Sequence, residues 1–147
     1  MSGQHYPELD LSASCDCGAI TMSVKGRILS MFQCACVNCQ KVSGSGHSSV
    51  VLVPADSVGI AGATKTISRT AASGATFTRH FCPECATTIC AFSSRAPGMR
   101  ILPAGLFAGQ NDWFEPNQLI FARSHLAWDL IADHLPRHDT YRGTDSP

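Results

Sequence analysis

The chain has 147 residues, 44% of them hydrophobic, which is the usual size and composition of one globular domain. Eleven basic residues balance eleven acidic ones, and the basic residues are scattered, which argues against a nucleic-acid-binding face. No apolar run approaches the roughly 20 residues of a membrane span, and the first 15 residues lack a signal-peptide pattern. We therefore expect a cytoplasmic protein with a single domain over residues 1–147, its core covering about 12–140 between frayed ends.

Short strand-like segments, punctuated by Gly and Pro, dominate the chain. In the first, 19–26, Ile20, Met22 and Val24 alternate with small or polar residues. Six more expected strands are 48–54, 64–70, 76–81, 87–92, 99–107 and 117–124. Helical turns are expected over 37–44 and near 128–134, and the polar tail 138–147 is expected to fray. Strands at this spacing, without long helical patterns, favour an all-β sandwich or open barrel.

Eight cysteines are the most informative residues of this sequence, and seven of them lie in closely spaced sets. A disulfide framework belongs to small secreted domains with weak cores. This chain is larger, and cysteines separated by one or two residues are the usual chelating pattern. We therefore interpret the cysteines as metal ligands.

The first set combines two pairs that lie far apart in the chain. It consists of Cys15, Cys17, Cys82 and Cys85, with 64 residues between the pairs. Four thiolates are the full complement of a structural Zn²⁺ and leave it no open position. We expect this site to join distant parts of a β domain and to have no catalytic role.

The second set, in the segment CACVNC, consists of Cys34, Cys36 and Cys39, with no fourth cysteine or histidine beside it. Three protein ligands and one exchangeable position are typical of catalytic zinc. Two other interpretations remain: a distant fourth ligand such as Cys90 or a histidine, or a vestigial, partly occupied site. Cys90 itself lies in an apolar strand, where a cysteine usually serves as a small core residue.

Three thiolates restrict the chemistry of a zinc ion. A zinc ion together with three thiolates has a net charge of about −1, which weakens the ion as a Lewis acid. A fourth thiolate still binds readily because sulfur is a soft ligand. Binding keeps that sulfur ionised at neutral pH. We therefore expect thiol chemistry against an electrophile, with two Zn²⁺ per chain, one structural and one more labile.

The segments CDCGAI, CACVNCQKVSGSG and RHFCPECATTI, in this order, resemble the family of glutathione-dependent formaldehyde-activating enzymes, which includes centromere protein V. Trp128 and the segment HLPRH look like a weaker tail pattern of that family, so the resemblance covers roughly residues 12–140. It implies a twisted open β-sandwich, with a structural zinc on the first cysteine set and a second zinc on the other. Ala35, Ala86 and Ala127 stand where family members commonly have His, Gly and Pro.

The resemblance also implies a reaction: formaldehyde and glutathione join to give S-(hydroxymethyl)glutathione, catalysed by a carbon–sulfur lyase at the zinc of Cys34, Cys36 and Cys39. The carboxylates of glutathione need partners, and the candidates are Lys41, Arg79, Arg95 and Arg100 with the Ser43–Ser45 loop. Each of these also fits an ordinary surface charge or turn. The alternative function is a non-catalytic zinc-binding domain that recognises a protein partner.

Overall fold

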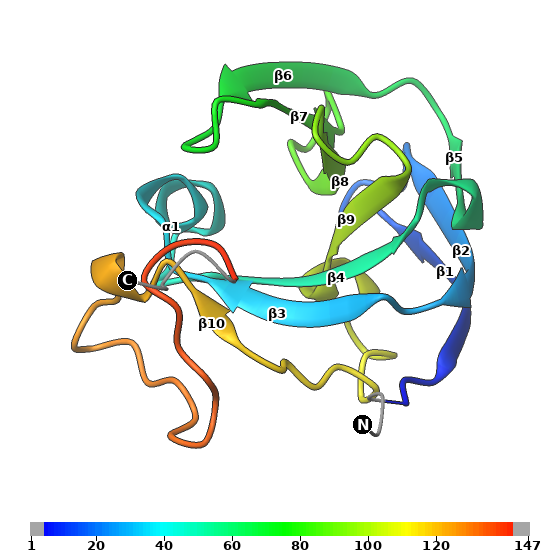
Figure 1. Cartoon of the computed structure of the whole chain (residues 1–147). Coiled ribbons are helices and arrows are strands. Elements are labelled where there is room, and N and C mark those ends of the chain that lie inside the picture. The colour runs from blue at the N-terminus through cyan, green and yellow to red at the C-terminus, as the bar shows by residue number, and fades with distance from the viewer. Residues whose placement is uncertain (1–4, 143–147) are drawn as a thin grey trace. The chain divides into compact units, whose positions relative to one another are not determined.

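The computed structural model describes residues 5–142, and this part of the chain is predominantly β, with one α-helix and three short 3-10 helices (Figure 1). The chain divides into two compact units. Unit 1 combines residues 1–29 and 51–113, and unit 2 combines residues 30–50 and 114–147. Among the described residues, no helix is long and apolar enough to cross a membrane. The mainly β class expected from the sequence is confirmed.

Unit 1 contains a three-stranded antiparallel sheet in the order β1-β2-β5. Its strands are β1 (Glu8–Ser14), β2 (Thr21–Arg27) and β5 (Val58–Ala61). Leu9, Met22 and Val24 are almost fully buried along one face, as the alternation of β2 predicts. β1 is not among the strands expected from the sequence, and it begins at Glu8, upstream of the expected core boundary at residue 12.

The other strands of unit 1 follow the order β4-β9-β8-β7-β6. They are the second half of β4 (Ser48–Pro54), then β6 (Lys65–Thr70), β7 (Thr76–Phe81), β8 (Thr88–Ser93) and β9 (Met99–Pro103). All five match expected strands closely, except that the expected strand 99–107 ends at Pro103. Pro103 precedes a 3-10 helix, Ala104–Phe107, which buries Phe107 completely. A shorter 3-10 turn, Ala55–Ser57, links β4 to β5.

Unit 2 contains β3 (Ser30–Cys34), α1 (Val37–Ser43), the start of β4, β10 (Leu119–Ile120) and a 3-10 helix, Ala122–Ser124. The strand order is β10-β3-β4, and β10 runs parallel to β3 (Figure 1). A small apolar core gathers Ala35, Leu119, Ile131 and Leu135. The expected strand 117–124 is shorter than predicted because Phe121 adopts a left-handed conformation with a φ of 56°, which ends the ladder.

Two expectations for the C-terminal region are wrong. Residues 128–134 form turns instead of a helix, with backbone hydrogen bonds from Asp129 to Leu126 and from Leu135 to Ala132. Residues 138–142 are held in place, because Tyr141 packs edge-on against Phe121 with ring centroids 4.8 Å apart. The remainder of the predicted frayed tail, residues 143–147, lies outside the described residues.

Candidate metal sites

The structure brings the first cysteine set together in unit 1. The Sγ atoms of Cys15, Cys17, Cys82 and Cys85 all lie within 4.8 Å of one another. Cys15 to Cys17 and Cys17 to Cys82 measure 3.6 and 3.7 Å between sulfurs. Tetrahedral zinc with Zn–S bonds of about 2.3 Å requires sulfurs about 3.8 Å apart, so this cluster fits a four-thiolate metal ion.

Two tight turns aim these sulfurs at one point. After β1, the amide of Ile20 donates to Cys15 Sγ (3.2 Å), which is typical of a thiolate ligand held in a knuckle. After β7, the amide of Ala86 donates to the Cys82 carbonyl (2.8 Å), and Ala86 has a φ of 66°. Glycine adopts this left-handed conformation more readily than alanine does, so the turn holds Ala86 in a less favourable backbone conformation.

The thiols of this cluster have strongly different proton affinities. A hydrogen bond with the Thr87 hydroxyl lowers the pKa of Cys85 to about 5. For Cys17 the backbone of Ala19 lowers the pKa, but desolvation and the neighbouring thiols outweigh it and raise the value to about 12. Four sulfurs at this spacing oppose joint ionisation, so a bound cation is the natural means of holding all four as thiolates.

The second cysteine set also comes together, in unit 2. Cys34 ends β3 and is buried, while Cys36 and Cys39 lie at the start of α1 and are half-buried. Their three Sγ atoms all lie within 4.8 Å of one another, which again fits thiolate ligands of one ion. Ala35, between two ligands, is completely buried in the core of unit 2, so the chain packs an apolar side chain there.

Local hydrogen bonds fix the helix that carries two of these sulfurs. Cys36 is the N-cap of α1, and its Sγ accepts from the amide of Cys39 (3.3 Å). The side-chain amide of Gln40 donates to the carbonyls of Ala35 (2.9 Å) and Ser124 (3.0 Å). Gly44 ends the helix with a φ of 69°, where a side chain would be strained. The segment that carries Cys36 and Cys39 is therefore held in place at both ends of α1.

Among residues 5–142, no other Cys, His, Asp or Glu places a donor atom in the three-cysteine cluster. Cys90 lies on β8 of unit 1, almost completely buried, where desolvation raises its pKa. This favours the core interpretation of Cys90 over its role as a distant fourth ligand. The described part of the chain thus supplies three sulfur donors, one fewer than a closed four-thiolate zinc site uses.

Two of these thiols, those of Cys34 and Cys39, do not ionise readily on their own. Hydrogen bonds with Cys36 and Cys39, together with burial, raise the pKa of Cys34 far above the ordinary thiol range. For Cys39, the hydrogen bond with Cys34 lowers the pKa, but Cys36 and burial raise it to about 11. As in the first cluster, close sulfurs make a cation the favourable partner.

Sequence reasoning missed a polar network beside the second cluster. His47 Nδ1 donates to the buried carboxylate of Asp129 (2.7 Å), and the Gln33 amide donates to His47 Nε2 (3.2 Å). Asp129 in turn accepts at its backbone carbonyl from His125 Nε2. A Cβ at Gly46 would collide with the Asp129 carboxyl group, so only glycine permits this approach. No signal in the sequence pairs residues 82 positions apart.

This network helps to position the segment that carries the cysteines, but its side chains do not point toward the three sulfur atoms. Gln33 and Cys34 are consecutive on β3, so their side chains point to opposite faces of the strand. His47 follows α1 and Asp129 belongs to the C-terminal turns, so their contact fixes the exit of the helix. We infer a structural role for the network in unit 2.

Replacing Asp129 by Ala should lower the free energy of unfolding by about 2–3 kcal/mol, because the half-buried His47 Nδ1–H would lose its carboxylate acceptor. Urea denaturation measures this loss. The matched control is Asp133→Ala, an exposed carboxylate in the same segment, which should change stability by less than about 0.5 kcal/mol. Equal losses for the two variants would show that the His47–Asp129 contact contributes nothing.

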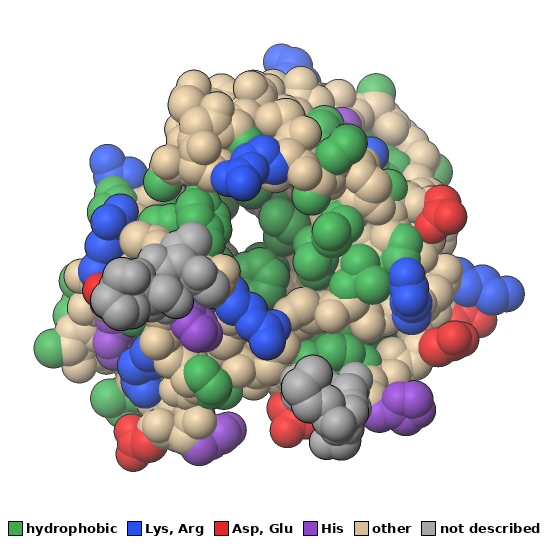
Figure 2. All heavy atoms as spheres, viewed as in Figure 1, with side chains coloured by type: hydrophobic (Ala, Val, Ile, Leu, Met, Phe, Trp, Pro, Cys, Tyr) green, Lys and Arg blue, Asp and Glu red, His purple; other side chains and the backbone are tan. Residues whose placement is uncertain are grey.

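The candidate cations differ in their surroundings. Lys41 and Arg95 are exposed, and Arg100 donates from Nη1 to two backbone carbonyls of its own turn. Arg79 lies half-buried on β7. On the face seen in Figure 2, Lys and Arg side chains are dispersed and form no continuous basic patch.

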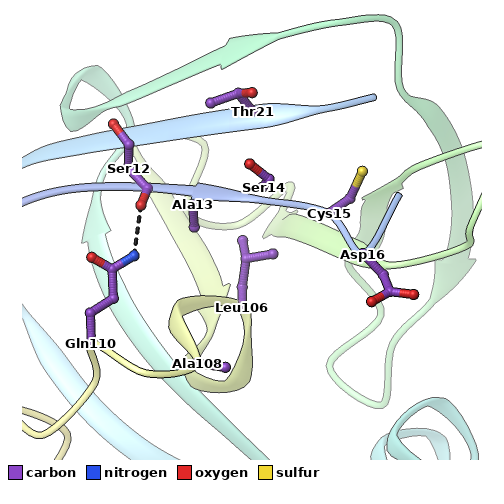
Figure 3. A pocket seen from close by; sticks show the side chains of 9 residues that line it. All are labelled: Ser12, Ala13, Ser14, Cys15, Asp16, Thr21, Leu106, Ala108 and Gln110. Carbon is purple, nitrogen blue, oxygen red and sulfur yellow. Dashed lines mark hydrogen bonds between the residues drawn. The ribbon is translucent and has the colours of Figure 1, made fainter. Parts of the chain in front are cut away.

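A pocket of about 450 Å³ lies in unit 1, and none of the three cysteines of the second cluster lines it (Figure 3). Cys15 and Asp16 lie at one end, and Gln110 lies at the other, where its amide donates to the Ser12 carbonyl (2.7 Å). The lining is mostly small side chains, and Cys15 already belongs to the four-cysteine cluster. The pocket therefore brings together no further catalytic groups.

Comparison with known proteins agrees with the cysteine geometry. The family described as "Glutathione-dependent formaldehyde-activating enzyme" matches residues 10–124, which include all seven clustered cysteines. The crystal structure of a Rhodobacter sphaeroides protein is similar in fold, with a TM-score of 0.54 and 17% sequence identity. That match covers 69% of this chain and 92% of the other. Among curated proteins, none matches the sequence significantly.

Proposed function

Because the chain belongs to the family of glutathione-dependent formaldehyde-activating enzymes, we propose that it is a zinc-dependent carbon–sulfur lyase that joins formaldehyde to glutathione. The observation that supports this proposal is the cluster of Cys34, Cys36 and Cys39, which has no fourth protein donor within the described residues. The four-cysteine cluster would hold a second, structural zinc. A cytoplasmic location, where free thiols stay reduced, is part of the same proposal.

The proposed reaction is an addition of a thiol to a carbonyl group. The substrate sulfur bonds to the carbon of formaldehyde, the C=O π bond opens, and the oxygen takes up a proton to give S-(hydroxymethyl)glutathione. The reverse direction breaks the same C–S bond and releases formaldehyde. Zinc on three thiolates would keep a substrate thiol ionised near neutral pH, below the ordinary thiol pKa of about 8.5.

The chain's own residues preorganise this site. Cys34 is fixed by β3, and the sulfur of Cys36 is fixed as the cap of α1. Gln40 ties the helix to the backbone at Ala35 and Ser124, so the three sulfurs keep their spacing whether or not a substrate is present. The burial of Cys34 limits access of water to one side of the cluster.

Metal and thiol binding test this proposal together. With excess zinc, we expect two zinc ions per chain, from four and three sulfur ligands. Zinc-edge spectroscopy should show about 3.5 sulfurs per zinc, rising to about 4 when glutathione is added. Cys36→Ser should abolish the rise. A single zinc that survives dialysis, with Cys34, Cys36 and Cys39 freely alkylated, would contradict the two-site proposal.

A second candidate function, recognition of a protein partner, is favoured by two exposed side chains. Trp128 is 65% exposed and Leu130 is 90% exposed, on either side of the buried Asp129. Exposed aromatic and aliphatic anchors are common in binding surfaces. If both clusters are purely structural, glutathione will leave the sulfur coordination number unchanged, which separates this candidate from the lyase.

A further inference from the structure

Two arginines of unit 1 lie on one face of the sheet with no acidic partner. In the antiparallel register, Arg69 of β6 stands opposite Phe77 of β7, and Arg79 of β7 stands opposite Ile67 of β6. Paired residues share a face, and so do residues two apart on one strand. Arg69 and Arg79 are therefore diagonal neighbours, with their Cβ atoms about 7 Å apart.

Each arginine has one buried N–H group that no described residue accepts from. The Nε atoms of Arg69 and Arg79 are buried and have no hydrogen-bond partner there. The Arg69 guanidinium lies over the Phe77 ring, 5.1 Å from its centroid, which orients it without neutralising it. Buried donors are normally paired, so these two N–H groups stand out as sites for an acceptor.

Basic residues far outnumber acidic residues in the segment that carries the two arginines. Residues 65–103, which form β6 to β9, contain five Lys and Arg residues but one acid, Glu84, so five minus one gives a net charge of +4. The chain as a whole is neutral. Two positive charges held close together without a counterion repel each other, and an anion between them would offset that repulsion.

The same face also offers apolar contact. Ile67 is 54% exposed and Phe77 is half-buried, so both side chains can contact a ligand on this face. The forked guanidinium donors of arginine match a planar carboxylate in pairs. A ligand that suits this face combines carboxylate groups with an aliphatic portion.

We propose that the β6–β8 face bearing Arg69 and Arg79 is a binding site for the carboxylate groups of an anionic organic ligand. The ligand is either a free dicarboxylate or a peptide that carries carboxylates. This inference goes beyond the proposed lyase, because it requires neither the three-cysteine cluster nor a thiol.

The test is titration calorimetry of the zinc-loaded full chain at low salt with succinate and, separately, with S-methylglutathione, which has no free thiol. Arg69→Gln and Arg79→Gln should each weaken binding at least about tenfold, because a charged hydrogen bond is lost. Arg69→Lys should bind with intermediate affinity, since it keeps the charge and loses the fork. Binding of succinate supports a site for free dicarboxylates, and binding of S-methylglutathione alone supports a site for peptide carboxylates.

The matched control is Arg27→Gln, which removes the same charge from an exposed position of β2 in unit 1 and should change affinity less than about twofold. Thermal melts confirm that the variants are folded. Equal weakening by Arg69→Gln and Arg27→Gln would overturn the proposal in favour of a general charge effect, as would no binding of either ligand to the native chain. Loss of zinc in Arg79→Gln with unchanged anion binding would also overturn it, because Arg79 would then serve the nearby thiolates of Cys82 and Cys85.

Discussion

Cys82→Ser should prevent stable folding, whereas Cys39→Ser should leave the fold largely intact. Cys82 directly follows β7, is completely buried, and shares a four-sulfur cluster with the turn between β1 and β2. Metal binding to such a closed site is itself folding free energy, on the order of 10 kcal/mol in small zinc peptides. Cys39 belongs to a cluster with three protein donors, in a helix that Gln40 and the Cys36 cap also hold. Thermal melts with zinc analysis of each variant measure the difference.

Cys90→Ala controls for the loss of a buried thiol outside both clusters. It removes one small side chain from the core and should cost about 1–2 kcal/mol, with both metals retained. Chelator titration of the native chain adds a second measurement, since the three-donor site should release its zinc first and without unfolding. Equal melting temperatures for Cys82→Ser and Cys39→Ser would contradict the division into a structural and a functional site.

The two cysteine clusters are the part of this structure that could be predicted best from the sequence. Short spacings such as Cys82–Cys85 direct two sulfurs to one point through a tight turn, so residue type and spacing alone carry the geometry. The assignment of Cys15 and Cys17 to Cys82 and Cys85 also follows, because four thiolates complete one site. The absence of a fourth donor beside Cys39 depends on where Cys90 and the histidines lie in space, which no local pattern encodes.

The strands were less predictable where contacts between distant parts of the chain determine whether a strand forms. The segment of β2 alternates clearly, while β3 mixes Met31, Phe32 and Gln33 without a clear period, because its two faces pack against different surroundings. β10 has two residues and depends on pairing with β3, which is distant in sequence. The tail contains few apolar residues, yet Tyr141 packs against Phe121. The amino-acid composition of the tail does not predict this contact.

Polar networks and the arginine face show the same limit. His47 and Asp129 pair although they are 82 positions apart in the sequence. Arg79 is an ordinary basic residue in the sequence, and only the register of β6 and β7 places it beside Arg69. The even balance of charge over the whole chain conceals the positive charge of residues 65–103. Sequence therefore locates the reactive sulfur atoms and leaves their surroundings to the fold.

Cys36→Ser should abolish catalysis of the exchange between formaldehyde and glutathione while the protein stays folded. Serine is a preferred N-cap, so this variant keeps the capping interaction of α1 and removes one thiolate from the cluster. With two sulfur donors left, the site should no longer hold the substrate thiol in its ionised form. Because thiols add to formaldehyde in water unaided, the native rate must be measured against the reaction without protein. Exchange spectroscopy at equilibrium does this, with Cys90→Ala as the active control and Cys36→Ser expected at the background rate. If native protein with both zincs bound adds nothing to the background, formaldehyde and glutathione are not its substrates, and the three-sulfur cluster must act on another thiol or serve a binding role.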